Sequence, residues 1–211
     1  MDITIICSDK QHKIFPYLEK WVTKNSKNYN ISLVTKSKEI TKGDILFLIS
    51  CIEIIKVDIR KRFKHALVIH ESDLPDGKGW SPLTWQIING TNTIPISLFD
   101  AKDKVDSGDI WKKTYVKLED HEITNEINFK IFTTKIKLMD FAIKSMNSIK
   151  KIPQEGKSSF FSRRKPEDSE LDVNKTIKEQ FDLMRIADNE RYPCFFNFRG
   201  HRYKVTLSKI S

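Results

Sequence analysis

The sequence lacks the features of a membrane, secreted or metal-binding protein. No apolar run approaches the roughly 20 residues that a membrane-spanning helix needs. The opening residues, Met1–Thr4, place no basic region before an apolar stretch, so they do not resemble a secretory signal. The three cysteines are odd in number and isolated, which favours neither a disulfide framework nor a zinc site. We therefore expect a cytoplasmic protein with reduced thiols, no membrane attachment and no bound metal.

Signatures of nucleotide and nucleic-acid binding are also missing. Neither a GxGxxG fingerprint nor a P-loop occurs, so a bound dinucleotide or nucleotide hydrolysis has no support. The net charge of +9 could indicate nucleic acid, an anionic surface or an anionic small molecule as partner. However, the lysines are scattered, with no basic block and no interleaved aromatic ladder, as on a solvated surface. We do not expect nucleic acid to bind, whereas a phosphorylated substrate needs only a few of these charges.

Strand and helix patterns alternate along the chain, which predicts an α/β fold with a doubly wound, mostly parallel sheet. The length of 211 residues and the 39% hydrophobic content suffice for one substantial core. Strands are expected from Ile3, at Ile31–Val34 and at Ile45–Ile49, the last an apolar run typical of a strand covered on both faces. Residues at helical spacing predict a helix after the first strand: Ile14, Tyr17, Leu18 and Trp21. A basic run, Arg60–Lys64, is expected to face solvent.

The second half of the chain predicts two further helices and a hairpin. One long amphipathic helix is predicted to cover the sheet, although such helices also pair across homodimers; its stripe is Phe132, Ile136, Met139, Ile143 and Met146. A final helix carries a shorter stripe, made of Ile177, Phe181 and Met184. Residues 192–210 form two short strands joined at Arg199-Gly200, a predicted β hairpin.

The central stretch, residues 66–110, carries the chemistry. The apolar run Ala66–Ile69 predicts a buried strand that ends at His70, beside a loop with proline and glycine. Ser81-Pro82 predicts the start of a short helix, and Gly90 its end. Alternating apolar residues then predict a half-buried strand, and these are Ile94, Ile96 and Leu98.

Asp106 follows that last strand in a loop. Open α/β sheets place ligands at the carboxyl ends of strands, so His70 and Asp106 could meet at one sheet edge. A carboxylate that holds an imidazole fixes its tautomer and raises its basicity. From spacing alone, a capping histidine and a turn aspartate remain an alternative.

The residue identities in this stretch are more specific than the spacing of His70 and Asp106. It reads HESDLP from His70 to Pro75, then Lys78-Gly79, then DSGDI from Asp106 to Ile110. It resembles the formyltransferase family that takes its one-carbon unit from N10-formyltetrahydrofolate and includes methionyl-tRNA formyltransferase and the sugar N-formyltransferases. The wording from Gly79 to Trp85 looks like a distinct branch of that family.

The resemblance implies roles for particular residues. His70 would accept the proton of the attacking amine, or in its protonated form stabilise the oxyanion, and Asp106 would orient the imidazole. The pterin of the donor would lie near Ile52, Ile54, Lys104 and Val105, where ordinary loop packing is the alternative. The acceptor would lie near Glu71, Lys78, Gly79 and Trp80.

One position departs from the family pattern. The catalytic asparagine of the family lies two residues before the histidine, and this chain has Val68 there, which cannot donate a hydrogen bond. Either another donor replaces the asparagine, with protonated His70 the first candidate, or the activity is reduced or absent.

Residues 151–172 have the composition of a linker but contain Phe160-Phe161 beside Arg163 and Arg164. Guanidinium groups bind phosphates and aromatic rings stack on bases, and the segment resembles one of sugar-nucleotide formyltransferases. We therefore predict that it closes over the acceptor, with a solvated basic loop as the alternative. The domains would be a catalytic domain at 1–150, this acceptor-proximal loop, and a C-terminal helix and hairpin at 173–211.

The expected function is formyl transfer from N10-formyltetrahydrofolate to the amine of a nucleotide-linked amino sugar, such as a 4-amino-4,6-dideoxy sugar for surface polysaccharide or O-antigen. The C-terminal extension looks too short for the tRNA-binding barrel of methionyl-tRNA formyltransferases, which favours a small acceptor. No metal is required, because the amine is already a nucleophile. The alternatives are a formyl hydrolase, transfer to another amine, or a non-catalytic binding protein with the inherited fold.

Overall fold

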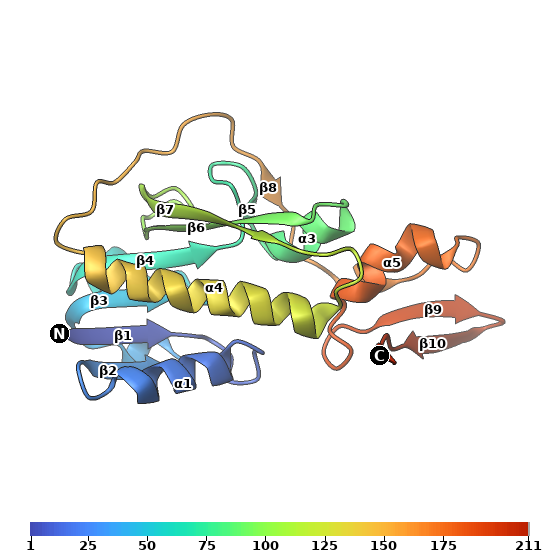
Figure 1. Cartoon of the computed structure of the whole chain (residues 1–211), viewed down its shortest axis with the longest axis horizontal. Helices are drawn as coiled ribbons and strands as arrows, with labels where there is room; N and C mark the ends of the chain where they lie inside the picture. The colour runs from blue at the N-terminus through green and yellow to red at the C-terminus, as the bar shows by residue number, and fades with distance from the viewer. Residues whose placement is uncertain (211) are drawn as a thin grey trace.

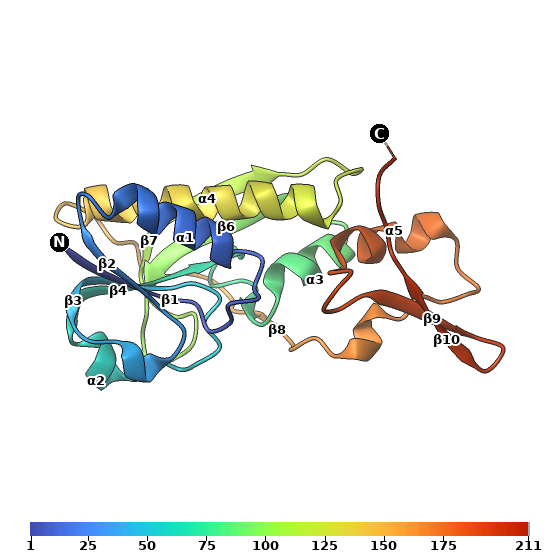
Figure 2. The same cartoon turned by 90° about the horizontal axis from the view of Figure 1, so that it is seen from below.

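The computed structural model describes residues 1–210 and shows one six-stranded sheet with helices on both faces (Figures 1 and 2). In spatial order the strands are β2 (Asn30–Val34), β1 (Asp2–Ile6), β3 (Gly43–Leu48), β4 (Phe63–His70), β6 (Thr93–Asp100) and β7 (Ile110–Lys117). The first four are parallel, whereas β6 and β7 each run antiparallel to the preceding strand. The predicted α/β class with a mostly parallel sheet is confirmed.

Two helices cover one face of the sheet. The helices α1 (Phe15–Asn25) and α4 (Thr124–Ser145) lie side by side there (Figure 2), and the Trp21 indole donates a hydrogen bond to Asp140 at 2.7 Å. The predicted stripe of α4 is buried or half-buried against the main core, with Met146 just past the helix end. The helix therefore covers the sheet as predicted.

The opposite face carries a smaller core beneath α2 (Val57–Arg60) and the 3₁₀ turn η1 (Ser37–Glu39). Alternate residues of β3 enter the two cores, so this strand is covered on both faces as expected: Ile45 and Phe47 on one side, Leu46 and Leu48 on the other. The prediction of a half-buried strand at residues 94–98 was wrong. All of residues 94–99 are buried, because the loop after β4 covers the second face: Ser97 Oγ donates to the Ser72 carbonyl oxygen at 2.7 Å, and Phe99 packs against Leu74.

The expectation of a solvent-facing basic turn at Arg60–Lys64 was also wrong for Arg60. The helix α2 ends at Arg60, and β4 already begins at Phe63. The Arg60 side chain is only 11% exposed. Its guanidinium turns inward because backbone carbonyl groups of two loops accept its hydrogen bonds, from Ile55 and Ala101.

Short elements surround the end of β4. The helix α3 (Pro82–Ile88) begins after Ser81 and ends before Gly90, as predicted, but Ser81 adopts a left-handed φ of 49° and its side chain caps nothing. The strand β5 (Lys78–Gly79) pairs in parallel with β8 (Phe160–Phe161). The segment with linker-like composition therefore makes backbone hydrogen bonds beside His70 and continues into the turn η2 (Pro166–Ser169).

The C-terminal elements lie together at one end of the molecule (Figure 1). They are α5 (Ile177–Ile186), β9 (Cys194–Phe198) and β10 (His201–Val205). The predicted hairpin is confirmed, and its turn places Arg199 and Gly200 at φ values of 51° and 83°, which suits the twist of a two-residue hairpin loop. Ile177, the first residue of the predicted stripe, is 71% exposed and remains outside the core.

The division into segments 1–150, 151–172 and 173–211 stays a prediction, and Ser211 lies outside the described residues. Within residues 1–210, no helix is long and apolar enough to span a membrane. The three cysteine thiols are free, and burial raises the pKa of each, that of Cys194 to about 11.

Candidate functional site

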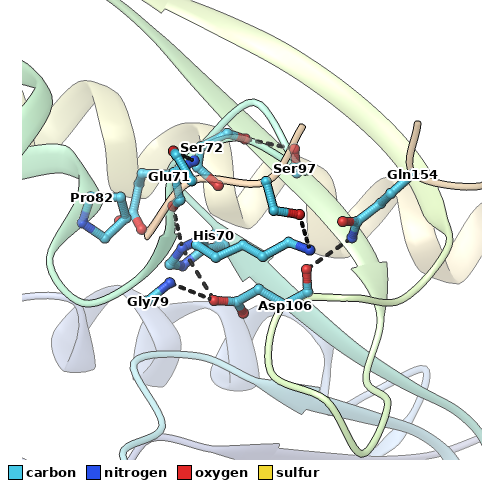
Figure 3. A network of polar contacts seen from close by, with 12 residues as sticks. His70, Glu71, Ser72, Gly79, Pro82, Ser97, Asp106 and Gln154 are labelled. Atoms are coloured by element: carbon cyan, nitrogen blue, oxygen red, sulfur yellow. Dashed lines mark hydrogen bonds and ion pairs between the residues drawn. The ribbon is translucent and has the colours of Figure 1, made fainter. Parts of the chain in front are cut away.

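His70 stands at the carboxyl end of β4, and its imidazole is oriented through one nitrogen. Nε2 lies 3.2 Å from the Gly77 carbonyl oxygen and 3.6 Å from Oδ2 of Asp106 (Figure 3). Both neighbours are hydrogen-bond acceptors, so Nε2 carries a hydrogen and Nδ1 is left as the basic nitrogen of the neutral ring. The side chains of His70 and Asp106 are only 12% and 9% exposed, so the pair is shielded from water.

Asp106 reaches His70 by a route that the sequence did not predict. The strand β6 is antiparallel to β4, with Ser97 beside His70 and Asp100 beside Leu67, so the chain has already run past His70 when β6 ends. Residues 101–109 must therefore fold back toward His70. This return brings Gly108 so close to Asp100 that an added Cβ would lie 1.6 Å from the Asp100 carbonyl oxygen. The two residues do meet, but a shared edge of parallel strand ends is not the reason.

The short strand β5 also binds Asp106, through the backbone of Gly79. The backbone N–H of Gly79 donates to Oδ2 of Asp106 at 3.0 Å (Figure 3). Gly79 has a φ of 97°, and a Cβ there would lie 2.6 Å from the Phe161 carbonyl oxygen, so the close approach of β8 requires glycine. Lys78, the residue before Gly79 in β5, is 4% exposed and donates from Nζ to Ser158 Oγ at 3.1 Å. Burial and the nearby charge of Lys104 lower the pKa of Lys78, and Asp106 partly opposes them.

Gln154 is a site residue that the sequence analysis missed. Its Nε2 donates to the Asp106 carbonyl oxygen at 3.0 Å (Figure 3). It also donates to the Gly108 carbonyl oxygen at 2.8 Å. Its Oε1 is buried and has no hydrogen-bond partner among residues 1–210. A lone glutamine in a charged, proline-containing segment gave no signal, yet it fixes that segment to the loop that carries Asp106.

Glu71, predicted to contact the acceptor, lies in a buried ion pair. Its Oε1 is 2.6 Å from Nζ of Lys135, and the two side chains are 14% and 4% exposed. Burial alone would raise the pKa of Glu71, but the charges of Lys135 and His70 outweigh burial and hold that pKa below its usual value. Sequence reasoning missed Lys135, although a lysine on the buried face of a helix, between Ile131 and Leu138, was a visible signal.

The residues predicted to hold the donor lie on two loops beside the pair. Their apolar side chains are uncovered: Ile52, Ile54 and Val105 are 64%, 76% and 52% exposed. Lys104 is exposed as well. Their role in donor binding stays a prediction.

The residues predicted to hold the acceptor differ in availability. Trp80 is 42% exposed, and the Arg163 guanidinium lies 4.9 Å from the centre of its ring. Arg164 is instead half-buried and donates to the Asp168 carbonyl oxygen at 2.9 Å and to Ser169 Oγ at 3.0 Å. Arg163 makes no ion pair with another of residues 1–210, so its charge is available to a ligand.

Val68 is half-buried and packs against an apolar cluster of Leu74, Phe99 and Ile110. It therefore offers no donor at the position of the family asparagine. Across residues 1–210, no group of three or more histidine, cysteine, aspartate and glutamate side chains could hold a metal ion. What the site offers is an oriented imidazole, a buried carboxylate and a buried lysine, which suits transfer of an acyl-type group to an amine.

The α/β fold and this site define the chain as an enzyme of the group-transferase class. A family model described as "Formyl transferase" matches residues 4–143, and the chain belongs to that family. The predicted family is therefore confirmed, and the reaction of that family is formyl transfer with formyl-tetrahydrofolate as the one-carbon donor.

Individual relatives resemble the chain in sequence or in fold. The bifunctional polymyxin resistance protein ArnA of Wigglesworthia glossinidia brevipalpis is 29% identical over 174 residues, which cover 81% of this chain and 27% of that protein. The chain thus spans about a quarter of that relative's length. The methionyl-tRNA formyltransferase of Clostridium thermocellum superposes with a TM-score of 0.85 and 25% identity, over 100% of this chain and 94% of that one. A sugar N-formyltransferase from a Shewanella species shares the fold, with a TM-score of 0.74 and 13% identity over 99% and 97% of the two chains.

Proposed function

We propose that this enzyme transfers the formyl group of N10-formyltetrahydrofolate to the primary amine of a nucleotide-linked amino sugar, in the cytoplasm, for surface polysaccharide. The observation that carries the acceptor class is the exposed Trp80 ring beneath the Arg163 guanidinium. Trp80 directly follows Gly79, whose backbone binds Asp106, so this pair lies next to the chemistry. An aromatic face and a free guanidinium suit a nucleobase and a phosphate. The sugar N-formyltransferase of the same fold supports this acceptor class.

In the proposed reaction the neutral amine attacks the formyl carbon. A bond forms between the amine nitrogen and that carbon, and the bond from the carbon to N10 of the donor then breaks. Nδ1 of His70 takes the amine proton and returns it to N10, while Asp106 supports the imidazolium ion. Val68 donates nothing to the oxyanion of the tetrahedral intermediate. We assign that role first to the imidazolium ion, with the buried ammonium of Lys78 as the other positive group.

The three segments fit this reaction. Residues 1–150 would form the catalytic domain, with the donor held by Ile52, Ile54, Lys104 and Val105. Residues 151–172 would close over the acceptor, because Gln154 and β8 already join this segment to the loops around His70. Residues 173–211 would form the C-terminal extension.

The test is an assay by mass spectrometry with N10-formyltetrahydrofolate and a panel of nucleotide-linked amino sugars, with charged methionyl-tRNA as a further acceptor. A sugar product heavier by one formyl group is expected. Formate released without any acceptor would instead establish a hydrolase. If only the methionyl-tRNA were formylated, the proposed amino-sugar acceptor would be wrong and the acceptor would be methionyl-tRNA.

A further inference from the structure

Arg60 joins two loops that approach the site from different strands. Its Nε donates to the Ile55 carbonyl oxygen at 3.0 Å, and its Nη1 donates to the Ala101 carbonyl oxygen at 2.7 Å. Its Nη2 also contacts the Asp103 carboxylate. A guanidinium presents its N–H groups as a planar fork, so one side chain can hold three acceptors at fixed angles. The Arg60 side chain is 11% exposed, so its hydrogen bonds to the two carbonyl groups are largely shielded from water, whereas the Asp103 carboxylate is 82% exposed.

The joined loops are those with the uncovered apolar side chains. The loop after β3 carries Ile52 and Ile54, and the loop after β6 carries Val105, each more than half exposed. A flat, largely apolar ring that settled between the two loops would remove this surface from water. The second loop also carries Asp106. The separation of the two loops therefore sets the width of the space that such a ring would enter.

Each loop has its own anchor as well. In the first loop, the Ile52 N–H donates to Ser8 Oγ at 3.0 Å. In the second, the Ala101 N–H donates to the Ala66 carbonyl oxygen at 2.7 Å. The first anchor ties the loop after β3 to the loop after β1, and the second ties the loop after β6 to the strand β4; Arg60 then ties the two donor loops to each other.

We infer that Arg60 is a positioning residue for the formyl donor, which fixes the separation of the two loops before the donor arrives. This inference rests on the proposed donor site. Loops already held in the binding geometry lose less conformational entropy on binding, so the donor binds more tightly. Arg60 acts through the backbone of Ile55 and Ala101 and does not touch the reacting atoms.

The test compares Arg60→Lys and Arg60→Met with a control, Arg62→Lys. Lysine keeps the charge of Arg60 but cannot bridge three acceptors. Arg62 is a matched control because it is 46% exposed and donates to the carbonyl oxygens of Asp58 and Ile40, neither of which lies on the two loops. Calorimetry would measure tetrahydrofolate binding by each folded variant, and steady-state kinetics would separate the KM of each substrate from kcat.

We expect the tetrahydrofolate Kd and the donor KM to rise about tenfold in Arg60→Lys and at least as much in Arg60→Met. The acceptor KM and kcat at saturating donor should stay within about twofold of wild type, because chemistry is untouched once the donor is bound. Arg62→Lys should bind tetrahydrofolate as wild type does. If Arg60→Met does not fold, Arg60→Lys decides.

Three results would overturn the inference. Unchanged tetrahydrofolate binding in folded Arg60 variants would remove Arg60 from donor positioning and leave the donor site standing. Equal losses in donor KM, acceptor KM and kcat would make Arg60 a general stabiliser of the fold. A wild-type chain that does not bind tetrahydrofolate would remove the proposed donor site, and the inference with it.

Discussion

The buried ion pair of Glu71 and Lys135 allows a prediction of a stability loss whose size depends on pH. The variant Lys135→Met leaves the Glu71 carboxylate buried without its partner at 2.6 Å. Removing one member of a buried pair costs about 3–5 kcal/mol, whereas replacing both members by apolar side chains of similar size is often close to neutral. For a domain of this size each kcal/mol lowers Tm by about 2–4 °C, so we expect Tm to fall by about 6–20 °C. The double variant Lys135→Met/Glu71→Met should recover most of that loss.

The pH dependence separates this cause from a simple packing defect. In the wild type the folded pKa of Glu71 lies below the usual 4.5, so its contribution is present above about pH 4.5 and is lost as the pH falls through the folded pKa. In Lys135→Met, burial dominates and raises the folded pKa above 4.5. Protonation then favours the folded variant, and its stability deficit relative to wild type should shrink as the pH falls from 7 toward 5.

The free energy of unfolding can be measured with urea at several pH values. The proteins compared are wild type, Lys135→Met, Glu71→Met and the double variant. The deficit of the double variant should not change between pH 7 and 5, because it has no carboxylate at position 71. The reasoning would be refuted if Lys135→Met were no less stable than the double variant and its deficit did not vary with pH.

Three further predictions concern the residues around His70 and Asp106. Gln154→Leu removes two partly buried hydrogen bonds to residues 101–109, so it should lower the free energy of unfolding in urea by about 1–3 kcal/mol and also lower kcat. Wild-type values of both quantities would show that these hydrogen bonds contribute to neither. Gly79→Ala should lower Tm far more than Gly90→Ala. Both glycines have a positive φ, but of the two an added Cβ has open space at Gly90 and none at Gly79. Equal losses of Tm would contradict this prediction. Arg163→Ala should raise the acceptor KM about tenfold, because the Arg163 guanidinium lies over the exposed Trp80 ring. Arg164→Ala should mainly lower Tm, because Arg164 donates a hydrogen bond within the fold. The reverse pattern would make Arg164 the acceptor-binding residue and Arg163 the structural one.

The sequence predicted the elements of the fold better than their pairing. Apolar runs and periodicity reveal strands and helices because each buries a defined face. They do not reveal direction, and so they did not show that β6 runs antiparallel to β4. That reversal explains the unexpected route by which Asp106 reaches His70. The burial of β6 on both faces has a separate cause, the loop after β4 that covers Ser97 and Phe99.

The polar residues around the site show the same limit. His70 and Asp106 were found through a motif, which records chemistry directly. Arg60 and Gln154 act on backbone carbonyl groups of loops distant in sequence, and such acceptors exist at every residue. Arg60 was expected in solvent because an exposed guanidinium is the common case, whereas here two carbonyl groups and a carboxylate hold it inward.

The central claim is that His70 and Asp106 form the catalytic pair of this formyltransferase. The most direct measurement is the single-turnover rate of formyl transfer for His70→Asn, Asp106→Asn and the double variant, each shown to be folded by circular dichroism. We predict that each single variant loses about 10²- to 10⁴-fold in rate. The double variant should be no slower than the slower single variant, because the two side chains act as a unit. Rates near wild type in both single variants would contradict the account.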